Sequence, residues 1–236
     1  MEIDKKMTLW VYDNIGRNNY LRIWPYYLGF VPYELFVLPL MFFSIAYSVF
    51  FDTLKPLQIY LLPMWVAYSI VKYIKGSIKR LRPGCNPNLK MGKFIDSKHC
   101  NDDEKNKSFP SGHTIMSFSL ATSLSLYCQD AIKKLHQNSV LMNFCIGIYF
   151  FIATLVGIQR IQDGYHHVSD VCVGAILGIF IGYFSYKFLD PYADMFNNRV
   201  EVETSNTYFF CKNLTVILCI FAIVTYYLYR VNIKMF

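Results

Sequence analysis

The sequence predicts an all-α, polytopic membrane protein with about six transmembrane helices. Uncharged apolar runs of roughly 17–25 residues, the length that crosses a bilayer, recur along the whole chain. Charged residues lie almost entirely between these runs. The chain has 236 residues, of which 54% are hydrophobic, and no stretch long enough for a separate soluble domain remains.

The predicted spans cover residues 30–51, 56–74, 112–129, 139–158, 169–188 and 209–230. The apolar part of the first span begins at Leu35, because Pro32 and Glu34 precede it. The second span is short, because Lys72 closes its uncharged run. A buried core helix is the alternative for any single span, and six spans in one chain of this length argue against it. We therefore expect one transmembrane domain over residues 30–230 and a C-terminal tail over residues 231–236.

Residues 1–29 are expected to lie on the membrane surface. Aromatic side chains are dense between residues 8 and 30 and are mixed with Arg17 and Arg22. Aromatic residues and arginine concentrate at the level of the lipid headgroups. The first twenty residues are charged and contain no apolar core of a signal peptide. A loosely ordered tail is the alternative.

The distribution of charge indicates which loops share one side of the membrane. With six spans, both termini and the loops after the second and fourth spans lie on one side, which carries most of the Lys and Arg residues. The positive-inside rule places that side in the cytosol. The net charge of +7 is spread over the loops, which favours contact with anionic lipid surfaces over nucleic acid.

Two of the predicted helices are expected at the centre of the bundle. Gly174, Gly178 and Gly182 recur at a spacing of four in the fifth span, and such rows let transmembrane helices approach closely. The third span is rich in Ser and Thr, which point toward protein or water more often than lipid. We expect these two helices to lie next to the functional site.

Arg160, His166 and Asp170 lie between the end of the fourth span and the start of the fifth, and they indicate nucleophilic chemistry. His166 and Asp170 are four residues apart and share one face of a helix. A carboxylate that binds one ring nitrogen leaves the other with a free lone pair, which makes histidine a nucleophile. His167 is a competing candidate, because it lies three residues from Asp170 and the spacing favours His166 only mildly.

The segment that precedes the third span supplies groups that suit a phosphate. Ser111 and Gly112 precede the third span, and a helix start with a Ser cap and a Gly is a ready anion site. His113 in the first turn is suited to act as a general acid, although a lone histidine there is usually a surface residue.

Lys75 and Arg82 flank the loop after the second span, and with Arg160 they would clamp phosphate oxygens. Snorkelling at a helix end is the alternative for Lys75. We expect the two basic residues between them, Lys79 and Arg80, to face lipid headgroups. All three motifs fall on the same side of the six-span topology, as one common site requires.

These motifs resemble those of the phosphatidic acid phosphatase type 2 (PAP2) superfamily, which includes vanadium haloperoxidases. The matching residues are Lys75 to Arg82-Pro83, Pro110 to His113, and Arg160 with His166 and Asp170. The sequence of these motifs is most similar to that of eukaryotic lipid phosphate phosphatases. The resemblance covers residues 75–190. The resemblance implies a helical bundle core of the PAP2 and haloperoxidase type. It also favours His166 over His167.

The resemblance further implies a role for each site residue. His166 forms a phosphohistidine that Asp170 orients, and His113 protonates the leaving alcohol and then activates water. The expected phosphate-binding residues are Lys75, Arg82, Ser111, Gly112 and Arg160. No metal or other cofactor is implied. Two departures from the family pattern are Gln159, where Ser is usual, and two spans in place of three before the first motif.

The implied function is a metal-independent lipid phosphate phosphatase that hydrolyses the phosphomonoester of phosphatidate-like lipids. A phosphatase for diacylglycerol or polyisoprenyl pyrophosphate is the alternative. A vanadate haloperoxidase agrees less well with the six spans. An inactive lipid-binding relative agrees less well with the filled motif positions, and a transporter leaves the motif spacings unexplained. The expected partners are the phosphorylated lipid and membrane lipids, with no nucleic acid; a homo-oligomer is left open.

The expected location is an endomembrane of the endoplasmic reticulum type or the plasma membrane. Members of the family usually work on the lumenal or exoplasmic face, whereas the charge count places the site in the cytosol. Cys85 and Cys100 lie in the same loop as Arg82. A disulfide between them would favour an oxidising lumen, and two free thiols are the alternative.

Overall fold

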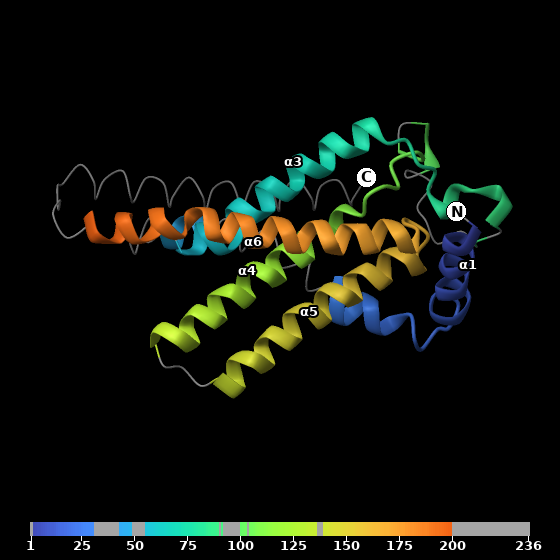
Figure 1. Cartoon of the computed structure of the whole chain (residues 1–236). Helices are drawn as coiled ribbons and strands as arrows, with labels where there is room; N and C mark the ends of the chain where they lie inside the picture. Colours follow the sequence, from blue (N-terminus) through green and yellow to red (C-terminus); the bar gives the residue numbers. More distant parts are fainter. Residues whose placement is uncertain are drawn as a thin grey trace, which may run out of the picture.

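The computed structural model describes residues 2–30, 43–48, 55–89, 91, 100–102, 104–135 and 139–199, and these are mostly helical. The chain begins with α1 (Glu2–Val11), followed by helical turns at Tyr12–Gly16 and Pro25–Phe30. A turn at Leu57–Leu61 runs into α3 (Leu62–Ser77). The long helices α4 (Gly112–Leu135), α5 (Ser139–Gln162) and α6 (Val168–Arg199) complete the bundle (Figure 1).

Within the described residues, three helical segments are long and apolar enough to cross a membrane: Leu57–Ser77, Ser139–Gln162 and Val168–Phe188. They match three of the predicted spans. Helix α4 forms where the third span is predicted but is less apolar, because Ser and Thr interrupt its sequence. The first and sixth predicted spans fall outside the described residues, apart from a helical piece at 43–48.

Helices α4 and α6 pack backbone against backbone, as the glycine row predicts. A Cβ atom added to Gly178 would lie 2.5 Å from the carbonyl oxygen of Ile115, and one added to Gly182 would lie 2.3 Å from that of Ser119. Gly174 faces Ser111 and Thr114 in the same way. The two helices are therefore joined along a seam that begins beside the predicted site.

The hydroxyl side chains of α4 face the protein, as expected. The buried members of this set are Ser117, Ser119, Thr122, Ser123 and Ser125. Several of these hydroxyls donate to backbone carbonyls of their own helix, for example Ser125 Oγ to the oxygen of Ala121 at 2.6 Å. This back-bonding satisfies the hydroxyl groups of Ser117, Thr122, Ser123 and Ser125 inside an apolar bundle, whereas Ser119 Oγ is buried without a hydrogen-bond partner among the described residues.

Residues 2–30 pack against the end of the bundle at which α5 ends and α6 begins (Figure 1). Gly16 lies against the carbonyl of Gln162, and Gly29 lies against Leu155. Tyr12 is buried, whereas the aromatic residues on the outer side are exposed; they include Trp10, Tyr20, Trp24 and Tyr27. Exposed aromatic rings suit the predicted position at the membrane surface, which stays a prediction.

Candidate active site

Three loops that are distant in sequence meet at one end of the bundle and are joined there by backbone hydrogen bonds. Gly84 N donates to Gly164 O at 2.9 Å, and Ser108 N donates to Arg80 O at 3.0 Å. Ser111 N donates to Asp170 O at 3.2 Å. The structure thus brings the three predicted motifs together.

The turn between α5 and α6 directs His166 into this site. Gly164 has a φ of +77°, a conformation that glycine adopts without strain. The N–H groups of Tyr165 and His166 both donate to the carbonyl of Arg160, at 3.1 and 3.2 Å. A side chain at Gly164 would also press on Gly84, because an added Cβ would lie 3.1 Å from its Cα. The glycine therefore permits both the turn and the contact between loops.

The His166 ring is held in one tautomer by the backbone of Ser108. His166 is 1% exposed, and its Nδ1 lies 2.5 Å from the carbonyl oxygen of Ser108. A carbonyl only accepts hydrogen bonds, so Nδ1 carries the proton and Nε2 keeps a free lone pair. Burial lowers the pKa of His166 to about 3, and the nearby cations Lys75, Arg160 and Arg82 also lower it. The ring is therefore neutral at physiological pH, as a nucleophile must be.

Asp170 is fully buried and lies close to both Ser108 and the His166 ring. Its carboxylate accepts from Ser108 Oγ at 2.5 Å, from Arg80 Nη1 at 2.5 Å and from the His167 N–H at 2.9 Å. The distance from Asp170 Oδ2 to His166 Nδ1 is 3.9 Å, which is too long for a hydrogen bond. In place of the expected direct hydrogen bond to the ring, Asp170 binds the Ser108 hydroxyl, and the carbonyl of the same Ser108 binds His166 Nδ1.

His167 and Asp170 also form the start of α6. The Asp170 carboxylate accepts the backbone N–H of His167, which is one half of a capping box, and Asp170 N donates to the backbone carbonyl of His167 at 3.1 Å. The His167 ring turns toward the first loop, where Nε2 donates to the Leu81 carbonyl at 3.2 Å. The competing histidine is therefore bonded to a different loop from His166.

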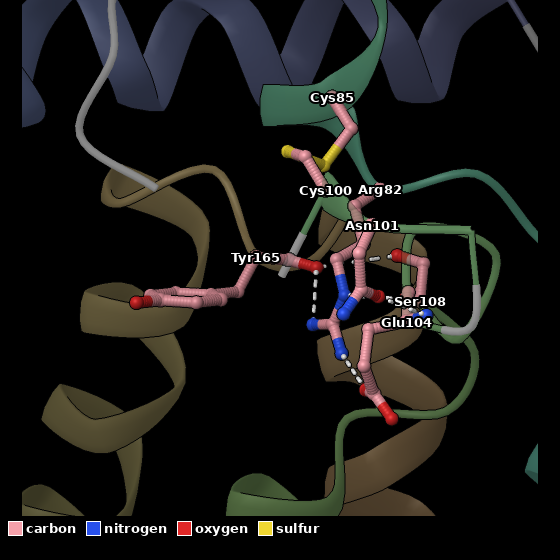
Figure 2. The surroundings of a disulfide bond; sticks show 7 residues. All are labelled: Arg82, Cys85, Cys100, Asn101, Glu104, Ser108 and Tyr165. Atoms are coloured by element: carbon pink, nitrogen blue, oxygen red, sulfur yellow. Dashed lines mark hydrogen bonds and ion pairs between the residues drawn. A yellow bond between two sulfur atoms is a disulfide. The ribbon is translucent and has the colours of Figure 1, made fainter. Parts of the chain in front are cut away.

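Arg82 is 4% exposed and is fixed by the loop that follows it (Figure 2). Its guanidinium group donates to the Glu104 carbonyl at 3.0 Å, to the Glu104 carboxylate at 3.3 Å and to the Tyr165 carbonyl at 3.4 Å. A disulfide joins Cys85 to Cys100 beside it, so the alternative of two free thiols is wrong. The disulfide holds this loop against Arg82.

Arg160 is 6% exposed and lies between two aromatic rings. Its Cζ atom is 3.8 Å from the centre of the Tyr165 ring and 5.4 Å from that of Phe30. Such cation–π contacts orient the guanidinium plane. Phe30 also lies beside the predicted acid, with 5.7 Å between its ring centre and that of His113. Lys75, in the last turn of α3, interacts electrostatically with both Arg82 and Arg160.

Ser111, Gly112 and His113 begin α4, as predicted. Ser111 Oγ lies 2.8 Å from Thr114 Oγ1, and its N–H donates to the backbone carbonyl of Asp170, so the hydroxyl and the N–H of Ser111 both have partners within the fold. Gly112 lies close to the Val71 side chain, 3.1 Å from the position of an added Cβ. The binding of phosphate by Ser111 and Gly112 stays a prediction.

Gln159, which stands where the family pattern described above has Ser, is 2% exposed. Its side-chain amide donates to Asp163 at 2.6 Å, and Arg22 pairs with the other carboxylate oxygen at 3.3 Å. Burial raises the pKa of Asp163, and Arg22 and Arg160 oppose this rise. The amide thus takes part in a hydrogen-bonded network at the end of α5.

Sequence reasoning placed Arg80 wrongly and missed Ser108 and Asp4. Arg80 was expected to face lipid headgroups, yet its guanidinium binds Asp170, Ser169 and Asp4. Ser108 directly precedes the second motif, which is a usable signal, whereas nothing in the sequence marks Asp4. No group of three or more His, Cys, Asp or Glu side chains suited to a metal ion occurs in the described residues.

Comparisons with known proteins find similar sequences. The model of the PAP2 superfamily matches residues 56–193. "Lipid phosphate phosphatase 1" of Arabidopsis thaliana is 32% identical over 195 residues, 74% of this chain and 56% of that protein. "Probable lipid phosphate phosphatase 4" of the same plant is 38% identical over 131 residues, 50% of this chain and 42% of that protein. The chain spans about half the length of these relatives.

Solved structures share the fold. A transmembrane PAP2-type phosphatidylglycerolphosphate phosphatase from Bacillus subtilis superposes with a TM-score of 0.61 at 24% identity. The superposition covers 79% of this chain and 84% of the bacterial one. At this level of sequence identity, the similarity shows a shared fold and nothing further about this chain.

Proposed function

The chain belongs to the PAP2 superfamily and is an integral membrane protein, and we propose on this premise that it is a lipid phosphate phosphatase. It removes the phosphomonoester of phosphatidate-like lipids without a metal ion, with His166 as the nucleophile. The observation that best supports this proposal is the bond from His166 Nδ1 to the Ser108 carbonyl. That bond leaves Nε2 with a lone pair in a site that also holds three cations.

In the first step, His166 Nε2 attacks phosphorus and the bond from phosphorus to the lipid oxygen breaks. His113 gives its proton to that oxygen, which leaves as an alcohol. Lys75, Arg82 and Arg160 neutralise the charge that spreads over the three remaining phosphoryl oxygens. Because these cations are held by the fold, they need little reorganisation during the reaction. The product of the step is a phosphohistidine.

In the second step, a water molecule replaces the lipid alcohol. His113, now neutral, takes a proton from the water as the oxygen attacks phosphorus. The bond from phosphorus to His166 Nε2 breaks, inorganic phosphate leaves, and both histidines return to their starting states. Asp170 contributes by holding Ser108 in place throughout, which keeps the proton of His166 on Nδ1.

A lipid pyrophosphate is the second candidate substrate, because three cations are enough for a more highly charged headgroup. Both candidates present a terminal phosphoryl group to the same nucleophile. They differ in the leaving group, which is an alcohol for the monoester and a phosphate ester for the pyrophosphate. The two are therefore separated by assay with matched acyl chains.

We also propose six spans, with the site on the lumenal or exoplasmic side. The disulfide between Cys85 and Cys100 supports this orientation, because structural disulfides persist on oxidising sides of membranes. A cysteine placed at the half-exposed Lys105 should stay unlabelled by an impermeant maleimide in sealed endomembrane vesicles with the cytosolic side outward. Labelling before the vesicles are opened would put the site in the cytosol.

The deciding experiment measures phosphate release from phosphatidate and from diacylglycerol pyrophosphate in detergent micelles with excess EDTA. The wild type should release phosphate, and His166→Ala should not, although it is produced normally. His136→Ala, which changes a histidine outside the three motifs, serves as the control. Release by His166→Ala at the wild-type rate would contradict the assignment of the nucleophile. Absence of release by the wild type from both lipids would contradict the proposed function.

A further inference from the structure

Helix α1 contributes a carboxylate to the catalytic end of the bundle. Asp4, whose side chain is 16% exposed, accepts from the backbone N–H of Ser169 at 2.9 Å and from its hydroxyl at 2.8 Å. The same carboxylate binds Nη2 of Arg80. Asp4 therefore touches both the start of α6 and the loop after α3, although 76 residues separate it from Arg80 in sequence.

Arg80 binds two carboxylates at once. Its Nη2 donates to Asp4, while its Nη1 donates to Asp170 at 2.5 Å and to Ser169 Oγ at 2.7 Å. A guanidinium group is a rigid planar fork, so fixing one side of it fixes the direction of the other. An anionic partner at Nη2 therefore helps to hold Nη1 against Asp170. Asp4 is that partner.

A continuous set of hydrogen bonds connects this pair to the nucleophile. Asp170 accepts from Ser108 Oγ, and the carbonyl of the same Ser108 accepts from His166 Nδ1 at 2.5 Å. We propose that Asp4 is a positioning residue, which holds Arg80 against Asp170 and thereby sets the orientation of the His166 ring. The kinetic part of this proposal rests on the proposed function.

The competing explanation is that Asp4 only caps α6. Its bond to Ser169 N satisfies one free N–H of that helix, and Thr8 Oγ1 accepts the neighbouring N–H of Val168 at 3.1 Å. A cap stabilises the fold without reaching the nucleophile. Thr8→Val removes one such cap, together with the bond that Thr8 Oγ1 donates to the backbone carbonyl of Asp4 at 2.7 Å, but it removes no bond of the Asp4 carboxylate or of Arg80, so it is the control for this explanation.

The kinetic test compares Asp4→Asn with Thr8→Val and Glu2→Gln. Glu2 lies on the same helix, but its side chain is 83% exposed and pairs with Lys6. Asp4→Asn should lower kcat about tenfold, the scale of one charged hydrogen bond, with KM unchanged because Asp4 does not touch the phosphate. Thr8→Val should lower only the thermal midpoint, and Glu2→Gln should change neither. Asp4→Glu should recover most of the lost rate.

A second readout does not depend on turnover. The buried Nδ1–H of His166, in a short hydrogen bond, should give a far-downfield proton resonance that is absent from His166→Gln. Asp4→Asn should shift or broaden that resonance, and Glu2→Gln should not. If Asp4→Asn does not fold, Arg80→Lys replaces the fork by a single point donor and should change the resonance and kcat in the same direction.

An unchanged resonance in both Asp4→Asn and Arg80→Lys would overturn the proposal, whatever lipid the protein hydrolyses. So would a wild-type kcat in Asp4→Asn, or an equal loss of kcat in Thr8→Val. A wild type that is inactive on both lipids, but whose resonance responds to Asp4→Asn, would instead overturn the proposed function and leave the positioning role supported.

Discussion

Ser108→Ala tests whether Asp170 acts on the nucleophile directly or through a neighbour. In the structure, Ser108 Oγ donates to Asp170 at 2.5 Å, while the Ser108 carbonyl accepts from His166 Nδ1. The substitution removes the hydroxyl and keeps the carbonyl. It therefore removes the bond from Ser108 to Asp170 and keeps the bond between Ser108 and His166 that sets the tautomer.

The expected size of the effect follows from the bond that is lost. A hydrogen bond to a charged group contributes about 1.5–3 kcal/mol. Asp170 would keep Arg80 and the His167 N–H, so we expect it to stay ionised and the protein to fold. If the whole loss appears in the transition state, kcat falls about 10- to 150-fold, since 1.36 kcal/mol is a factor of ten.

The assay is a double-mutant cycle that combines Ser108→Ala with Asp170→Asn, with steady-state phosphate release as the readout. A relay predicts strong coupling, so that the double variant is about as slow as Asp170→Asn alone. Ser125→Ala removes another buried hydroxyl, one bonded to the Ala121 carbonyl, and should leave kcat unchanged. A wild-type kcat in Ser108→Ala, or fully additive effects in the cycle, would refute the relay.

Three further predictions concern pH, the disulfide and the helix seam. Burial lowers the pKa of His166 to about 3, whereas the unfolded side chain binds a proton near pH 6.5, so its contribution to stability is present above pH 6.5 and is lost as the pH falls toward 3. Between pH 7 and pH 5 the thermal midpoint of the wild type should therefore drop further than that of His166→Gln. Equal drops would contradict the shift in pKa. Replacing Cys85 and Cys100 with Ser opens a loop with a sequence separation of 15 and should cost about 3 kcal/mol of stability, seen as a lower midpoint that reductant reproduces in the wild type; an unaffected midpoint would count against the clamp. Gly178→Ala should lower the midpoint because its Cβ meets backbone at 2.5 Å, while Gly147→Ala, with nothing within 4 Å, should not; similar midpoints for the two would contradict close packing of the seam.

Periodicity and apolar length predicted the helices well, since these features are local. The expected spans at 139–158 and 169–188 correspond to α5 and to the first two thirds of α6. Helix α4 also forms where expected, but its hydroxyl groups make it less apolar than a lipid-facing span. Its place in the bundle followed from those hydroxyl groups and from the glycine row of α6, and both inferences are confirmed.

The site was predictable only as far as each motif carries its own chemistry. His166, Arg160 and Arg82 could be predicted because the residue types and the spacing of the motifs mark each of them individually. The partners of Arg80 could not be read from the sequence, because Asp4 and Asp170 lie 76 and 90 residues away from it. A basic residue beside other basic residues looks like a headgroup contact until its partners in three dimensions are known.

The seam between α4 and α6 also bears on how a substrate reaches the site. With a glycine of one helix in van der Waals contact with the backbone of the other, no gap as wide as a hydrocarbon chain remains between them. A lipid whose headgroup enters the site must therefore keep its tails on another flank of the bundle. The glycine row, whose evident role is helix packing, thereby closes the side between α4 and α6 to lipid tails. A lipid with two tails must approach the site from another side of the bundle.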